Sequence, residues 1–394
     1  MKIAYCGPIS LKLLSDLVDN PDSLPEGYEY PLGSYLVRSY VSMGHDVCVV
    51  TSSNFQKNSR STWKGNGLTI WNTNRRRYMK YVLDAYAFER SQMVRALQDY
   101  EPDIIHAQWT YEFAHAAHAS GIPFVVTVRD SPWTIASLTR SWYRIYRAIY
   151  AHYIFNKTEH LTAISDYVAA KVRDHYSYSS PIKIIPNGLM PDLFSNTPHT
   201  MHKGDAVRFA SVSGWDPRKN VKTLLRAFSK LLKKFPKAQL ALIGGGLGKG
   251  EACETWAIRN NLDRNVAFLG WRDHSDIIEY LRTSVDIFVH STVEESFCMT
   301  VLEAMAQGLP VVALPESGAI PWLLDNGNAG ILAKSQCPDC LSEAMIELAS
   351  DISLRDQLCR KAHRRAMDEF SLDKVSREYL ELFDSILQNR EGVS

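Results

Sequence analysis

The sequence carries no excess charge of either sign. Its 394 residues include 44 Lys and Arg against 43 Asp and Glu, which leaves a formal net charge of +1. Without a basic surplus, no overall field attracts the chain to nucleic acid, and we expect no nucleic-acid partner. An anionic small molecule must therefore be bound by a local group of basic residues.

Long apolar runs and a cysteine framework are also lacking. Apolar runs such as 122–128 are far shorter than the ~18 residues of a membrane span. The apolar start, residues 1–9, is followed by Lys12 and shows no small-residue cleavage site. Seven cysteines form no closely spaced even set, and Cys337 and Cys340 make a single CxxC pair, which is too few ligands for zinc. We therefore expect a cytoplasmic protein.

Three familiar site motifs are missing. No Asp-x-Asp occurs, so we expect no metal cofactor, and no Gly-x-Ser-x-Gly occurs, which argues against an α/β-hydrolase. The glycine-rich run 244–250 fits neither GxGxxG nor a phosphate-binding P-loop. Around Gly245 it is either a loop where the backbone approaches a ligand or a tight turn.

Short β-branched runs do recur, with helical patterns between them. This alternation predicts an α/β protein with two doubly wound parallel sheets in tandem. The polar stretch 195–205 is the natural joint, which divides the chain into domains 1–197 and 198–371. The amphipathic tail from Leu372 can dock on either domain. The expected strands are 2–6, 46–51, 103–106, 124–128, 161–164 and 183–185, then 207–212, 239–243, 265–269, 286–290 and 310–313.

Two glutamates, Glu295 and Glu303, bracket a predicted strand-to-helix turn. Eight helical residues rise ~12 Å, so we expect the two carboxylates not to act on one atom. They suit the two hydroxyl-bearing ends of an extended ligand whose anionic middle lies at the helix N-terminus, as in a sugar nucleotide. Alternatively, Glu303 is a surface residue and Glu295 a helix cap.

Arg218 and Lys219 lie at another expected strand-to-helix turn. Two cations at such a turn can neutralise a diphosphate, because the helix N-terminus already favours anions. The alternative is a solvent-exposed turn without a ligand.

Over nearly its whole length, the chain resembles the retaining glycosyltransferases of the family-4 type. That resemblance implies the GT-B fold: two facing Rossmann-like domains with the active site in their cleft, and a C-terminal helix, 372–394, that returns to the first domain. The Glu pair followed by Ala-Met-Ala is its most specific part. The matching residues are Gly33, 43–47, His106 with Trp109, 127–130, 186–188, 218–220, Gly270, Glu295, Glu303 and 304–306.

The resemblance also implies a reaction and roles. A hexose would pass from a UDP- or GDP-sugar to a hydroxyl of a glycan, glycolipid or small molecule, with retained configuration and without a metal. Glu295 would hold the donor sugar, Glu303 the ribose, and Lys219 with Arg218 the diphosphate, while Gly33 would let a loop approach the phosphates. The other expected donor-side residues are Gly245, Trp271, Arg272, Ser296, Phe297 and Cys298.

Departures from the family pattern leave alternatives open. Arg129 replaces a histidine that meets the donor sugar, and a permanent cation cannot accept a hydrogen bond. We count Arg129 among the candidate catalytic residues, and Cys298 replaces a glycine. The alternatives are another GT-B enzyme, a sugar-nucleotide epimerase or phosphorylase, and a catalytically silent protein in which Arg129 holds an anion.

The segment 140–157 interleaves aromatic residues with Arg140, Arg144 and Arg147. Such a helix, with the arginines at 75–77 in the same domain, can lie on anionic lipid, which predicts a peripheral membrane contact. The alternative is a packed helix with a solvated face.

Overall fold

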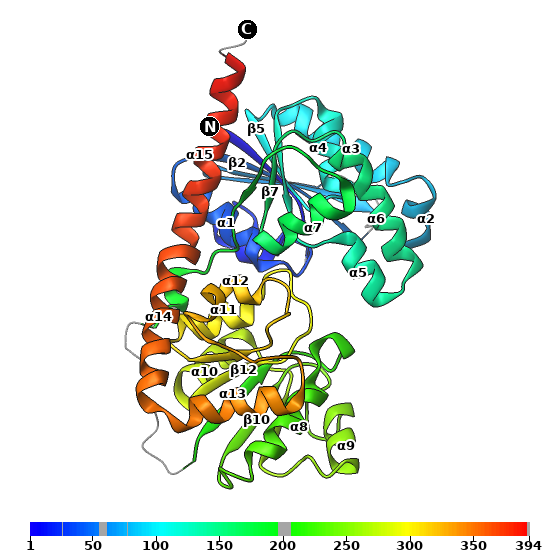
Figure 1. Cartoon of the computed structure of the whole chain (residues 1–394). Helices are drawn as coiled ribbons and strands as arrows, with labels where there is room; N and C mark the ends of the chain where they lie inside the picture. Colours follow the sequence, from blue (N-terminus) through cyan, green and yellow to red (C-terminus); the bar gives the residue numbers. More distant parts are fainter. Residues whose placement is uncertain (26, 55–60, 77, 196–205, 392–394) are drawn as a thin grey trace. The chain divides into compact units, whose positions relative to one another are not determined.

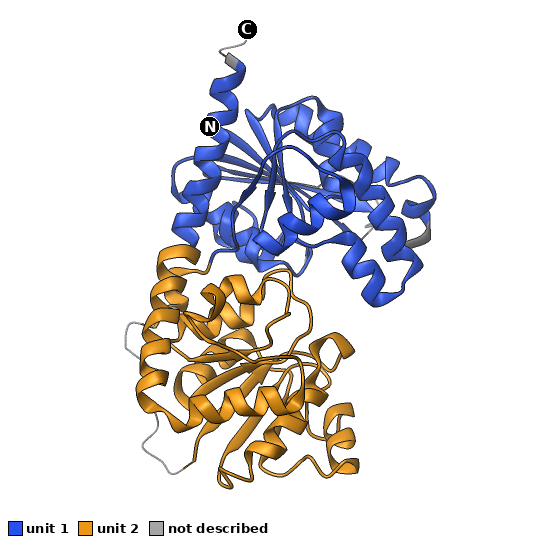
Figure 2. Ribbon diagram, viewed as in Figure 1, with its two compact units in different colours: residues 1–188, 372–394 blue, residues 189–371 orange. Residues whose placement is uncertain are grey.

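The structure is a computed structural model of the chain and describes residues 1–25, 27–54, 61–76, 78–195 and 206–391. It divides into two compact units (Figures 1 and 2). Unit 1 comprises Met1–Gly188 and Leu372–Ser394, and unit 2 comprises Leu189–Ser371. The predicted α/β class with two doubly wound units is confirmed.

Unit 1 is built on an eight-stranded sheet in the order β3-β4-β2-β1-β5-β6-β7-β8. All neighbours are parallel except β3 and β4. The strand order reverses between β1 and β5, and ligands bind at such a point in open α/β sheets. The strands are β1 (Lys2–Cys6), β2 (Asp46–Asn54), β3 (Ser61–Gly65), β4 (Leu68–Arg75), β5 (Ile104–Gln108), β6 (Phe124–Val128), β7 (Leu161–Ala163) and β8 (Ile182–Ile184).

The first six predicted strands all exist, but the sequence reading missed β3 and β4. Polar residues such as Asn72 and Asn74 interrupt β4, so it lacks the apolar run of a buried strand. The helices of unit 1 are α1 (Pro31–Ser42), α2 (Tyr78–Leu83), α3 (Ala87–Tyr100), α4 (Glu112–Ser120), α5 (Pro132–Thr139), α6 (Trp142–Phe155), α7 (Asp166–Tyr176) and α15 (Leu372–Glu391), with 3-10 turns at Leu11–Leu17 and Pro21–Ser23.

Unit 2 is built on a parallel six-stranded sheet in the order β11-β10-β9-β12-β13-β14. Its strands are β9 (Arg208–Val212), β10 (Gln239–Ile243), β11 (Val266–Gly270), β12 (Ile287–His290), β13 (Val311–Ala313) and β14 (Ile331–Leu332). Its helices are α8 (Val221–Leu231), α9 (Ala252–Arg259), α10 (His274–Ser284), α11 (Met299–Ala306), α12 (Ile320–Leu323), α13 (Pro338–Ser350) and α14 (Ile352–Phe370), with 3-10 turns at Pro191–Leu193, Pro217–Lys219 and Asp325–Gly327.

The units divide at Gly188, nine residues before the boundary at 197 that the sequence predicts. The reason is long-range hydrogen bonding: Leu189 N–H donates to Phe370 O at 2.8 Å, and Ser195 N–H donates to Ala306 O at 3.0 Å. These bonds hold 189–195 to the helices of unit 2. Most of the predicted joint, 196–205, lies outside the described residues.

The C-terminal helix α15 belongs to unit 1, as the resemblance implied. Phe383 packs edge-on against Tyr40 of α1, and the ring of Tyr379 lies 4.3 Å from that of His106. The Tyr379 hydroxyl also hydrogen-bonds Thr127 Oγ1 at 3.1 Å. These buried aromatic contacts attach the last helix to the sheet of the first unit.

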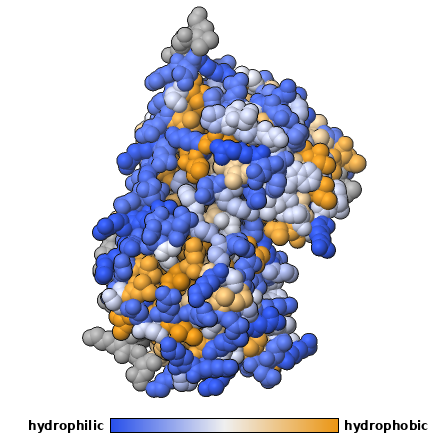
Figure 3. Space-filling view, in the orientation of Figure 1, coloured by the Kyte–Doolittle hydropathy of each residue, from blue (hydrophilic) through white to orange (hydrophobic). Residues whose placement is uncertain are grey.

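Helix α6 presents an apolar stripe to solvent. Trp142, Ile145, Ile149 and Tyr153 follow helical spacing, and each is more than a third exposed. In Figure 3, apolar side chains gather at the right-hand edge of unit 1, where Figure 1 places α2, α5 and α6. Among the described residues, no helix is both long and apolar enough for a bilayer span.

Candidate active site

The central pair of the site joins two loops at the carboxyl edge of the unit 2 sheet. Strands β9 and β12 are neighbours, so the turns that follow them meet. Lys219, in the turn after β9, places its Nζ 2.6 Å from Oε1 of Glu295, in the turn after β12. Glu295 is buried, with 8% of its surface exposed. The structure therefore brings together two of the predicted site residues.

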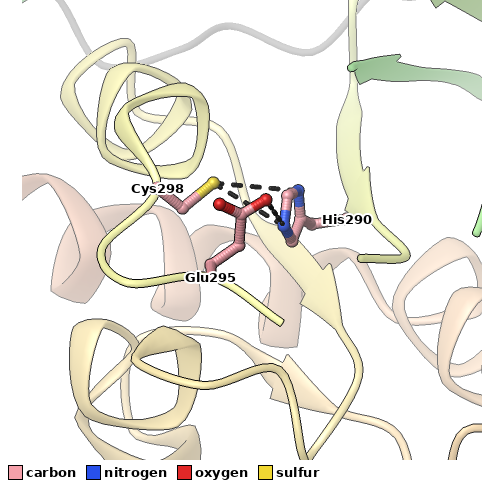
Figure 4. A group of neighbouring side chains, drawn as sticks. All are labelled: His290, Glu295 and Cys298. Carbon is pink, nitrogen blue, oxygen red and sulfur yellow. Dashed lines mark hydrogen bonds and ion pairs between the residues drawn. The ribbon is translucent and has the colours of Figure 1, made fainter. Parts of the chain in front are cut away.

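His290, the last residue of β12, adds a third charge to this pair and faces Glu295 (Figure 4). Its Nε2 lies 3.6 Å from Glu295 Oε1. Burial alone raises the pKa of Glu295, but His290 and the Lys219 ammonium outweigh it and lower that pKa to about 2. Burial lowers the pKa of His290, but Cys298 and Glu295 outweigh it and raise that pKa to about 9. Glu295 is therefore a carboxylate at neutral pH, able to accept hydrogen bonds from hydroxyl groups.

Cys298 directs its thiol at the same imidazole. Its Sγ lies 3.6 Å from His290 Nε2, and Figure 4 shows the two side chains pointing toward one another from the helix start and the strand end. The residue has φ +87°, a conformation that favours glycine. The chain thus carries a side chain where its backbone suits the glycine of the family pattern.

Within the described part of the chain, these three side chains are also the group that could hold a metal ion. The ligand atoms of His290, Glu295 and Cys298 lie within 4.8 Å of one another, and nitrogen, oxygen and sulfur are donors that zinc accepts. The Lys219 ammonium on the same carboxylate already supplies a positive charge there. That no metal takes part stays a prediction.

Glu303 is not the surface residue of the alternative interpretation. It lies on α11 with 7% of its surface exposed, and its Oε1 is 3.0 Å from Nε2 of His274 at the start of α10. The hydrogen bond to Glu303 outweighs burial and raises the pKa of His274. Nor does Glu295 cap α11, whose N-cap position is Cys298. Both glutamates are buried carboxylates with cationic or protonatable partners.

Arg218 points to a different acid from the one that holds Lys219. Its Nη1 lies 3.1 Å from Oε2 of the buried Glu294. The turn itself is fixed, because Asp216 accepts the Arg218 N–H at 2.8 Å and Ser291 Oγ donates to Lys219 O at 3.0 Å. The turn after β9 is therefore held in place on both sides rather than free in solvent.

The glycine-rich loop follows β10 at the same edge of the sheet. Gly245 accepts the Trp215 N–H at 2.9 Å through its carbonyl oxygen, so the loops after β9 and β10 are joined. A Cβ added at Gly245 would meet no atom within 4 Å. Open space in front of this backbone is consistent with a ligand approaching it.

The other donor-side predictions fall in different surroundings. Phe297 packs in an aromatic cluster with Trp322 and Phe370, so its side chain serves the core of unit 2. Ser296 is partly exposed beside it. Trp271 and Arg272 are exposed after β11, and within the described part of the chain they make no hydrogen bond or ion pair with Glu295.

Two predicted residues lie in unit 1. Gly33, near the start of α1, is required by packing, since a Cβ there would lie 2.2 Å from the Tyr5 hydroxyl. Arg129 follows β6 and hydrogen-bonds Gln108 and Asn187. Sequence reasoning missed the partners His290, His274 and Glu294; only the position of His290 at a strand end signalled a role.

Two known protein families match this sequence. The pattern of the family described as Glycosyltransferase Family 4 matches residues 34–193, and that of Glycosyl transferases group 1 matches residues 198–365. Together they take in most of the chain. The chain belongs to the GT-B glycosyltransferases of the family-4 type. The resemblance noted from the sequence is therefore confirmed.

Individual relatives of this glycosyltransferase from Rhizobium and Thermosynechococcus share less than a third of its residues over the aligned regions. The lipopolysaccharide core biosynthesis glycosyltransferase LpsE of Rhizobium meliloti is 29% identical over 181 residues, which cover 46% of this chain and 51% of LpsE. The chain thus spans about half the length of that relative. Sucrose-phosphate synthase of Thermosynechococcus elongatus superposes with a TM-score of 0.74 at 18% identity, covering 99% of this chain and 100% of the other.

A second solved structure is Anabaena HepE in complex with UDP-glucose. It gives a TM-score of 0.67 at 18% identity and covers 98% of this chain and 100% of the other. At such identities the superpositions show the fold, and the predicted GT-B architecture is confirmed.

Proposed function

We propose that the chain is a retaining glycosyltransferase that moves a hexose from a UDP- or GDP-sugar to a hydroxyl of a glycan, glycolipid or small molecule. The observation that carries this proposal is the buried carboxylate of Glu295 paired with Lys219 at 2.6 Å. A sugar offers hydroxyl donors to such a carboxylate, and a diphosphate offers negative charge to the ammonium. The UDP-glucose bound to HepE, a protein of the same fold, is consistent with this donor class.

The roles of the residues follow from their charges. Departure of the sugar leaves negative charge on the diphosphate, and Lys219, with Arg218 in the same turn, would stabilise it electrostatically. Glu295 would accept hydrogen bonds from the sugar hydroxyls and Glu303 from the ribose. Because Lys219 supplies the positive charge, we propose that transfer needs no metal ion.

The proposal predicts that Lys219→Ala slows transfer by about 10²- to 10³-fold, the usual cost of removing a charge-stabilising group. The measurement is nucleotide release from a panel of UDP- and GDP-sugars, with and without acceptor and chelator. Nuclear magnetic resonance then gives the anomeric configuration of the product. Lys230→Ala is the matched control, because Lys230 is exposed and pairs with Asp339 on the surface.

Other outcomes would contradict the proposal. Unchanged release in the Lys219 variant would remove the residue from the reaction. Conversion of the donor without any acceptor would indicate an epimerase, and release that depends on inorganic phosphate would indicate a phosphorylase. Nucleotide binding without turnover across the panel would indicate a silent binding protein.

We also propose that the protein is cytoplasmic and docks on anionic lipid through the exposed stripe of α6. The seven cysteines are free thiols, which suits a reducing compartment. Arg140 is exposed and Arg144 partly so beside the stripe. Arg147 contributes less than the sequence implied, because its guanidinium lies 3.5 Å from the centre of the Tyr111 ring.

Of the arginines at 75–77, Arg75 and Arg76 are engaged by neighbouring side chains and do not extend this basic surface. Arg76 is bound by Asp84 and Glu89 at 2.7 Å each, and Arg75 stacks over the rings of Tyr28 and Tyr81. Arg77 lies outside the described residues. Lipid contact therefore depends on the apolar stripe and the arginines of the α5–α6 region.

Replacing Trp142 and Ile149 by serine should reduce sedimentation with phosphatidylglycerol-containing vesicles by at least about threefold, since each loses apolar contact with lipid. Ile352→Ser is the control, because Ile352 is similarly exposed, at 58%, in unit 2. Equal sedimentation of all variants would contradict docking through this stripe. Binding to neutral vesicles as strong as to anionic ones would contradict the role of the arginines.

A further inference from the structure

Arg129 lies where an open α/β sheet binds its ligands. It follows β6 at the carboxyl edge of the unit 1 sheet, and its neighbour Gln108 ends β5, one of the two strands between which the order reverses. The third member of the group, Asn187, follows β8. All three side chains therefore gather at one end of the sheet.

The guanidinium is held only by neutral acceptors. Its Nε–H donates to Gln108 Oε1 at 2.8 Å, and Nη1 donates to Asn187 Oδ1. The amide of Gln108 is in turn 2.8 Å from His106 Nε2. Within the described ranges, no carboxylate lies within 4.0 Å of Arg129, and its Nη2 has no hydrogen-bond partner.

The described side chains that contact the guanidinium carry no negative charge. The Tyr30 ring centre lies 5.5 Å from the guanidinium carbon, and burial raises the pKa of Tyr5, Tyr30 and Tyr40, so these rings stay neutral. Burial, and then the charge of Arg129, lower the pKa of His106 well below its usual value. The adjacent carboxyl group, Asp130, receives the Tyr111 hydroxyl instead, at 3.5 Å.

Arg129 is partly buried, and a cation that loses part of its hydration without gaining a counter-charge is costly to keep. Two of its donors are fixed by Gln108 and Asn187, which orients the plane of the guanidinium, and Nη2 is left to bind a further group. A planar fork of this kind matches the two oxygens of a carboxylate or phosphate.

We propose that Arg129 forms an anion-binding subsite in unit 1 that recognises a carboxylate or phosphate group on a sugar substrate. That the anion is carried by a sugar rests on the function proposed above; the anion subsite itself does not. The residue then determines substrate choice, because an uncharged sugar leaves the cation without its partner.

The test measures binding to the full chain without any transfer step. Calorimetry compares glucuronate and glucose 6-phosphate with glucose, and UDP-glucuronate with UDP-glucose. We expect at least one anionic ligand to bind about tenfold or more tightly than its neutral counterpart. The Arg129→Gln variant should lose this preference by about 10- to 150-fold, the usual range for a hydrogen bond to a charged group.

The arms of the panel separate the sources of the anion. A preference for glucuronate indicates a carboxylate, one for glucose 6-phosphate indicates a phosphate, and one confined to UDP-glucuronate places the anion on the donor. Arg129→Lys keeps the charge and should retain part of the preference, whereas Arg95→Gln, at an exposed position on α3, should retain all of it.

Thermal unfolding provides the second readout. If Arg129 serves a ligand, Arg129→Gln should unfold at the same temperature as the parent chain or higher, and the anion that binds should raise the unfolding temperature of the parent only. A clear loss of stability in that variant would show a structural role and overturn the proposal. Equal binding of anionic and neutral ligands by the parent would overturn it as well, whether or not the chain transfers sugar.

Discussion

At the scale of single residues, the site depends on partners that lie far apart in the sequence. Glu295 has the properties of a permanent carboxylate because Lys219 and His290 surround it. The sequence predicted Glu295 and Lys219 from their turns, but no spacing rule connects Glu303 with His274, 29 positions away. Side-chain pairing across separate loops depends on the fold and is not encoded by local pattern.

The raised pKa of His290 makes the stability of unit 2 depend on pH. With a folded-state pKa of about 9 against 6.5, the protonated form is favoured by folding. The contribution of His290 to the free energy of unfolding is complete below about pH 6.5 and disappears as pH rises through 9. The free energy of unfolding falls by up to about 3 kcal/mol over this range. Denaturant unfolding at pH 6.5 and 9.5 measures this change.

His290→Asn is the comparison for that experiment. It removes the titrating group, so the fall in stability between the two pH values should shrink by most of the same amount. An identical fall in both proteins would show that other groups cause it. The lowered pKa of Glu295 affects stability at acid pH instead. Its contribution to the free energy of unfolding is present above about pH 4.5 and is lost as pH falls toward 2.

At the scale of elements, two loops and a glycine position the catalytic candidates. Gly318, which precedes α12, has φ +67°, and a Cβ there would lie 2.2 Å from the carbonyl oxygen of Glu295. Ala319 N–H donates to that same oxygen at 2.8 Å. The backbone that carries Glu295 is therefore clamped against the turn before α12.

Gly318→Ala should lower the free energy of unfolding by more than about 1 kcal/mol, the cost of φ strain alone, because the methyl group also displaces the Glu295 backbone. Nucleotide-sugar affinity should fall with it. Gly327→Ala is the matched control, since Gly327 also has positive φ, +101°, but its Cβ would meet nothing within 4 Å. Equal effects of the two substitutions would mean that contact with Glu295 plays no part.

Prediction from the sequence was most successful for apolar elements. Parallel strands buried on both faces, such as β1 and β6, appear as continuous apolar runs and were found. The polar β4 and the two-residue β14 carry no such signal and were missed. The boundary between the units was also misplaced, because the hydrogen bonds of Leu189 and Ser195 are tertiary contacts with no sequence signature.

At the scale of the whole molecule, the path of the chain sets the order in which its parts can be completed. Unit 2 is one uninterrupted segment, whereas unit 1 needs the final helix, whose Tyr379 and Phe383 cover Tyr40 and His106. During synthesis from the N-terminus, that helix leaves the ribosome after all of unit 2. Unit 1, which begins before unit 2, therefore closes its hydrophobic interior after unit 2 has been made, and a chain that stops short of residue 372 leaves those rings uncovered.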